Sequence, residues 1–261
     1  MGHTWLRGVP LSAKWLRVFE QLVGGAGLAA DDVAELAALT ADAASTALRK
    51  AADDAGLRHA FYILALTSKA ADETGLRGNL SRVGIDLPDR PCLFDLTVEI
   101  QAAIDDHIFR HGHPTDISEI AQQAVGEAVL EMVGGRTSVF DSGSAGVASS
   151  LESIASQTGF GRLGQLFFGR FAARFLNFYL SRITAEYVGS ARIPSVPELS
   201  RLNDELRLHC ENSAVVVLDV CERWYAATPR AQDASPETTA RLLSEALDKL
   251  ERQLMHEADD R

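Results

Sequence analysis

Apolar residues recur at spacings of three and four along almost the whole chain, and this periodicity limits the fold more than any other sequence feature. The last such stretch is the most regular, because Ala240, Leu243, Leu247, Leu250 and Leu254 are separated by three, four, three and four residues. Runs of strict apolar and polar alternation, which half-buried strands show, do not recur. We therefore predict an all-α fold, a multi-helix bundle of about seven to nine helices.

Capping residues and glycines predict where the helices begin and end. Ser12 can cap the first helix and Gly24 can end it, while Ser235 and Pro236 can start the last one. Between them we expect helices near 31–55, 57–71, 93–111, 116–133, 147–157, 162–188 and 198–227. The β-branched run at 214–218 also suits a buried strand, but the helical face continues on both sides of it and we favour a helix.

Two changes of composition divide the chain. Glycines and prolines gather between Gly75 and Pro91, and a polar linker runs from Thr228 to Ala234. We therefore expect an N-terminal helical subdomain at 1–80, a main helical bundle at 81–228 and a C-terminal amphipathic helix at 229–261.

Charge and cysteine content restrict the partners and the compartment. The 36 acidic residues outnumber 25 basic ones and give a net charge of −11, which disfavours non-specific binding to nucleic acid or anionic lipid. Three cysteines do not suit a disulfide framework, and residues 1–11 lack an apolar signal segment. Four arginines interrupt the longest plausible membrane segment, 160–183. We expect a soluble cytoplasmic protein that does not enter membranes. Arginine outnumbers lysine by 21 to 4, which suggests a GC-rich bacterial genome.

The helix near 162–188 is predicted to be central. It contains five of the chain's eleven phenylalanines, and its apolar residues cover more than half of its circumference. No acidic residue lies between Glu152 and Glu186, whereas four arginines give this segment a charge of +4. The positive strip of this helix therefore needs negatively charged partners.

A candidate anion-binding site lies at the glycine-rich start of the same helix. Its residues are Gly161, Arg162, Arg170 and Arg174. Backbone N–H groups at a helix start and guanidinium groups both bind phosphate. The literal G-x-G-x-x-G at 159–164 is not a dinucleotide fingerprint, because a predicted helix rather than a strand precedes it. Carboxylates of the chain itself are the favoured partners of these arginines. The alternatives are an external phosphate, a nucleic acid or an acidic partner, or exposure to solvent alone.

A candidate metal site follows from the histidines near residue 110. It comprises His107, His111, His113 and Asp116, with Glu119 as a further ligand candidate. The first two histidines are four residues apart on one predicted inward helix face, a spacing that lets two imidazoles bind one divalent ion. We favour hydrogen bonding at the helix end, with a metal site or a general base as alternatives. Asp106 and Arg110 are predicted to pair on the outer face.

Strong catalytic motifs are missing from the sequence, which has no P-loop, no G-x-S-x-G and no C-x-x-C. The leading hypothesis is a non-catalytic helical scaffold or complex subunit that binds a protein partner or a second copy of itself. Its candidate contact residues are Leu243, Leu247, Leu250 and Leu254, although two heptads more often dock on their own body. The alternatives are a metal- or ligand-binding helical enzyme that uses the histidines, and local phosphate or nucleic-acid binding by the arginines. No cofactor is expected apart from that divalent metal.

Overall fold

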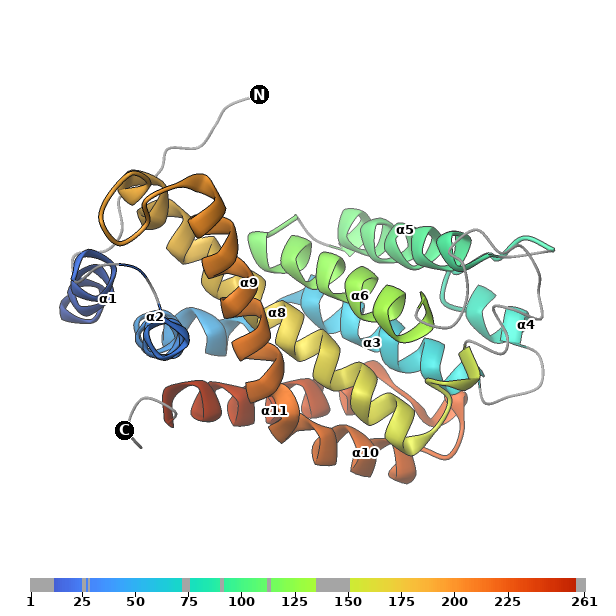
Figure 1. Ribbon diagram of the computed structural model, residues 1–261. Helices are drawn as coiled ribbons and strands as arrows, with labels where there is room; N and C mark the ends of the chain where they lie inside the picture. The colour runs from blue at the N-terminus through green and yellow to red at the C-terminus, as the bar shows by residue number, and fades with distance from the viewer. Residues whose placement is uncertain are drawn as a thin grey trace.

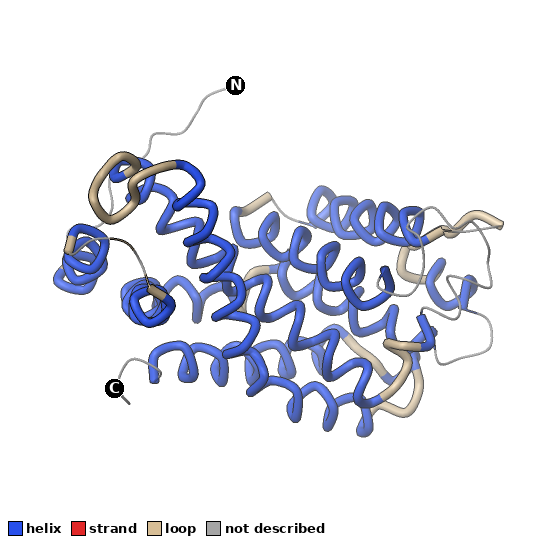
Figure 2. The backbone as a smooth tube through the Cα atoms, viewed as in Figure 1, coloured by secondary structure: helices blue, strands red, loops and turns tan. Residues whose placement is uncertain are grey.

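The computed structural model describes residues 12–24, 27, 29–71, 76–89, 92–111, 114–134 and 151–256 of the chain. Within these ranges it is a bundle of α-helices with two short 3-10 helices and no β-strand (Figure 1, Figure 2). The predicted all-α fold is confirmed.

The described residues form ten α-helices and two 3-10 helices. Their bounds are α1 (Ala13–Val23), α2 (Ala30–Ala51), α3 (Ala55–Ala71), α4 (Leu76–Ser81), α5 (Leu93–His111), α6 (Asp116–Gly134), α8 (Gln157–Tyr187), α9 (Val196–Ser213), α10 (Leu218–Ala227) and α11 (Pro236–His256), with 3-10 turns at Ala214–Val217 and Ala231–Asp233. The predicted caps Ser12 and Ser235 each accept a hydrogen bond from the backbone N–H three residues ahead, at 3.4 and 3.2 Å, and Thr115 caps α6 in the same way at 2.9 Å.

Two predicted helix boundaries are wrong. Residues 153–156 form a turn rather than the end of a helix at 147–157, and α8 begins at Gln157 instead of near 162. Ser156 caps this earlier start, because its side chain accepts a hydrogen bond from the Gly159 N–H. The predicted helix at 198–227 is also interrupted, since the β-branched run at 214–217 tightens into a 3-10 turn between α9 and α10.

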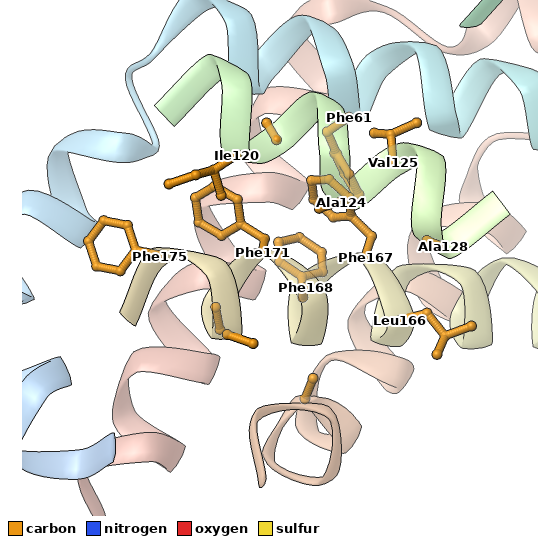
Figure 3. Packing of buried hydrophobic residues seen from close by; sticks show 14 of the residues in the cluster. Phe61, Ile120, Ala124, Val125, Ala128, Leu166, Phe167, Phe168, Phe171 and Phe175 are labelled. Carbon is orange, nitrogen blue, oxygen red and sulfur yellow. The ribbon is translucent and has the colours of Figure 1, made fainter. Parts of the chain in front are cut away.

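Helix α8 lies at the centre of the bundle, as predicted, and packs against α6, α9 and α10. Figure 3 shows Phe167 and Phe168 of α8 beside Phe61 of α3 and near side chains of α6. Both α8 rings have centroids 5.2 Å from that of Phe61, and all three side chains are fully buried. Among the described residues, no helix has the length and apolar content needed to cross a membrane.

The glycines near the start of α8 allow helices to approach closely. A Cβ atom on Gly164 would lie 2.4 Å from the Sγ of Cys221, and one on Gly161 would lie 2.7 Å from the Cγ of Glu222. Both contacts are with α10. Gly161 lies more than one turn inside α8, where its N–H belongs to the helix ladder rather than to a terminal anion site. The glycine-rich opening is therefore a packing surface, which corrects the role predicted for Gly161.

Helix α11 docks on its own chain. Its leucines at 243, 247, 250 and 254 are at most 3% exposed, and the helix packs mainly against α2 and α3. The favoured expectation of docking on the same body is confirmed. The alternative, in which Leu243, Leu247, Leu250 and Leu254 contact a partner, is wrong because the chain's own helices cover them.

A single hydrophobic cluster extends from Trp15 of α1 to Leu254 of α11. It includes buried residues from each of the three predicted units, 1–80, 81–228 and 229–261. The core therefore continues across both predicted boundaries.

Candidate functional site

Arg174 faces α6 across the surface of α8. Its guanidinium pairs with both carboxylate oxygens of Glu127, and Nη1 donates to the amide oxygen of Gln123 at 2.5 Å. Two parallel contacts between a guanidinium and a carboxylate are the strongest form of this interaction. The electrostatic demand of Arg174 is therefore met by α6.

Arg170, one turn earlier on α8, joins two further helices. It pairs with Glu131 of α6 and, through Nε at 3.0 Å, with Oε1 of Glu211 on α9. The same Oε1 atom also pairs with Nη1 of Arg207 at 3.0 Å. The favoured expectation, that carboxylates of this chain neutralise Arg170 and Arg174, is confirmed.

The four residues predicted to bind an anion do not form one site. Arg162 is exposed and donates to Oε1 of Gln165 at 2.6 Å, two turns away from Arg170. A hollow of about 190 Å³ does open beside Arg174, with Asn177 and Asn203 in its lining. An external anion there would have to compete with carboxylates that already contact the arginines.

The histidines form a stack between α3 and α5. The ring of His107 lies parallel to that of His59, with centroids 3.5 Å apart and an angle of 5° between the planes. The His111 ring also stacks on His107, with centroids 4.4 Å apart and an angle of 27° between the planes. His111 is exposed, so the prediction that it faces inward is wrong, and its Nδ1 lies 3.1 Å from the His107 carbonyl oxygen. The hydrogen bond expected at the helix end is therefore present.

The other predicted metal ligands do not join this stack within the described structure. His113 lies outside the described residues, and Asp116 is exposed at the first turn of α6. An imidazole binds a metal through a lone pair in the plane of its ring. The parallel rings of His59 and His107, 3.5 Å apart, therefore cannot direct two nitrogens at one ion. No three metal-binding side chains converge in the part of the chain that the structure describes.

His59, which sequence reasoning missed, forms the α3 end of this stack, with His107 between it and His111. Burial, together with the nearby His107 and His111 charges, lowers the pKa of His59 to about 4. Burial also lowers the pKa of His107, against the opposing effect of Asp106. Both rings are therefore neutral near pH 7, as close stacking requires. His59 was missed because its neighbour comes from another helix, and no spacing within one helix indicates that contact.

A pocket of about 340 Å³ adjoins the histidine stack. It is lined by Tyr62 from α3 and by Pro236, Glu237 and Ala240 from the start of α11. Burial raises the pKa of Tyr62, and a hydrogen bond from Ser235 lowers that of Glu237. The pocket is mostly apolar and has neutral imidazoles on one wall.

The outer face of α5 carries large exposed apolar side chains. Phe109 is 86% exposed, and Phe94 and Val98 are also exposed on this helix. Their spacings of four and eleven residues place all three on one face. Figure 1 shows α5 at the edge of the bundle, where it packs mainly on α3 and α6. The Asp106–Arg110 pair predicted for this outer side is present at 2.7 Å.

These apolar residues were missed in the sequence, although the helical spacing that placed Asp106 outward also places Phe109 outward. A groove of about 440 Å³ lies beside Phe109 between the C-terminal end of α5 and the start of α6, with Ile108, Pro114 and Gln122 among its lining residues. Phe109 lies both in the wall of this groove and in line with Phe94 and Val98, and we call these three side chains together with the groove the α5 face.

The chain was also compared with protein-family models, with curated proteins and with solved structures. None of these comparisons found a match.

Proposed function

We propose that this protein is a non-catalytic helical scaffold or complex subunit that binds a protein partner through the α5 face. The observation that carries the proposal is the 86% exposure of Phe109 in line with Phe94 and Val98. Aromatic side chains are enriched at the energetic centres of protein interfaces, and aligned apolar residues at a surface mark such interfaces.

The other candidate surfaces support this choice because their groups already have partners inside the fold. Arg170 and Arg174 contact carboxylates of α6 and α9. The leucines of α11 are buried against α2 and α3. By contrast, the α5 face has no described helix packed over it. A cytoplasmic location is part of the proposal, since none of the three cysteines forms a disulfide bond.

The test compares Phe109→Asp with Val215→Asp, which places the same charge at an apolar residue away from α5 that is 50% exposed. Circular dichroism should show an unchanged helix content for both variants. Each tagged protein is then used to capture partners from a lysate of the source cells. We expect Phe109→Asp to lose a partner that the parent and Val215→Asp retain. Identical partner sets for all three proteins would refute the proposal.

A further inference from the structure

We propose that the partner segment on the α5 face is a basic amphipathic helix, an inference that rests on the function proposed above. The apolar stripe consists of Phe94, Val98, Ala102 and Phe109. Its ends are fifteen positions apart, which corresponds to about 22 Å along the axis at about 1.5 Å per residue. A partner helix of about four turns matches this length and can insert apolar side chains at positions i, i+4 and i+7.

The groove is a concave pocket at the Phe109 end of this stripe. Phe109 forms part of its wall on α5, and Gln122 and Gln123 line it on α6. Ile108 is buried between the two helices at the same place. Its volume of about 440 Å³ holds more than one large apolar side chain, so the face combines a stripe with a pocket for an anchor residue.

Acidic side chains border the apolar residues on both sides. Asp95 and Glu99 follow one edge of the stripe, Asp105 lies in line with it, and Glu119 of α6 lies across the groove. None of the four forms an ion pair with a residue in the described ranges. A hydrogen bond from the Cys92 backbone N–H lowers the pKa of Asp95, so this carboxylate is ionised near neutral pH.

Helix α5 carries much less positive than negative charge. Arg110 is its only lysine or arginine, and it pairs with Asp106 at 2.7 Å. The face therefore presents unpaired negative charge around an apolar centre. A helix with leucine-like residues on one face and lysine or arginine on its flanks is complementary in both respects. A second copy of this chain would bring the same acidic border and be repelled, and an anionic membrane would be repelled as well.

The experiment uses the full chain and two fluorescein-labelled peptides of about 18 residues, long enough to span the stripe. Both peptides have leucines at the same amphipathic positions, and one has lysines where the other has glutamates. Binding is measured by fluorescence anisotropy at about 50 and 300 mM salt. We expect the lysine peptide to bind at least about tenfold more tightly at low salt, and this preference to shrink as salt rises.

Two protein variants separate the charge from the surface. The first combines Glu99→Lys and Asp105→Lys and should shift the preference at least about tenfold toward the glutamate peptide. Its control combines Glu186→Lys and Asp204→Lys, which changes the net charge equally at exposed positions away from α5 and should keep the preference. Phe109→Asp should weaken the binding of the lysine peptide.

The outcomes distinguish this inference from the proposed function. Phe109-dependent binding of both peptides with equal affinity overturns the basic partner but keeps a protein-binding face. Two results overturn the basic partner on this face. One is binding that Phe109→Asp does not change, and the other is no binding of either peptide at about 100 μM, the range of a weak interface. A dimer mass in light scattering that Phe109→Asp abolishes would place a second copy of the chain on this face instead. Sedimentation with phosphatidylcholine vesicles that the same variant abolishes would place a lipid surface there.

Discussion

The histidine stack predicts an acid-dependent loss of stability that can be assigned to one side chain. His59 is partly buried against His107, and its pKa in the folded chain is about 4 instead of 6.5. As pH falls, the unfolded chain therefore takes up the proton first, because its histidine has the higher pKa. The contribution of neutral His59 to stability is fully present above pH 6.5 and is lost progressively as pH falls toward 4.

The size of the effect follows from the two pKa values. At about 1.4 kcal/mol per pH unit, lowering the pH from 7 to 5 removes about 2 kcal/mol. Part of the ring contacts solvent, which screens the interaction, so we expect a contribution of about 1 kcal/mol. His59→Gln removes the titration while keeping a polar side chain of similar length. The difference in unfolding free energy between pH 7 and pH 5 should then be about 1 kcal/mol smaller than in the parent.

The assay is urea unfolding followed by circular dichroism at both pH values, with the slope of the transition held common. His256→Gln is the control, because His256 is exposed in the last turn of α11 and has no ring contact with the stack. Carboxylate titration affects all three proteins alike and cancels in the comparison. The reasoning is refuted if His59→Gln loses as much stability as the parent between pH 7 and pH 5.

Two further predictions test the packing of α8 and α10. Gly164→Ala should lower the unfolding free energy by about 1–3 kcal/mol, because its Cβ would lie 2.4 Å from the Sγ of Cys221. Gly78→Ala, whose Cβ would have nothing within 4 Å, should leave the unfolding free energy unchanged or raise it slightly. An equal effect of both substitutions in urea unfolding would contradict the close approach of α8 and α10. With a chromogenic disulfide reagent at pH 8, Cys92 should react in the native protein. Cys221 should react only after unfolding, since burial raises its pKa to about 12. Rapid reaction of every thiol before unfolding would show that the contact between α8 and α10 opens.

Local pattern was sufficient for most of the long helices, but it missed the short helix α4 in the segment between Gly75 and Pro91 and did not predict the helix junctions. The bounds of α5 and α6 agree with the sequence prediction to about one residue, because caps such as Thr115 act within three positions of themselves. The start of α8 was misplaced because glycines were interpreted as a helix opening. Their actual role depends on α10, and no local pattern shows how closely another helix approaches.

The candidate sites divide in the same way. Arginines at 170 and 174 were predicted to need carboxylates, and the need itself follows from like charges one turn apart. Which carboxylates pair with them does not follow from the local sequence, because Glu131 lies 39 residues from Arg170 and Glu127 lies 47 residues from Arg174 along the chain. The outward position of Phe109 could have been found from helical spacing, whereas its exposure depends on α5 lying at the edge of the bundle.

The sequence by itself determined that this chain is helical, where most of the long helices begin and end, and that the phenylalanine-rich helix α8 is central. Those properties arise from backbone hydrogen bonds and side-chain spacing over about four residues. Only the tertiary structure decided that α11 is covered by α2 and α3, that His59 stacks on His107, and that the outer face of α5 stays exposed. These outcomes depend on which distant segments come together when apolar faces are buried, and that choice is made by the whole chain.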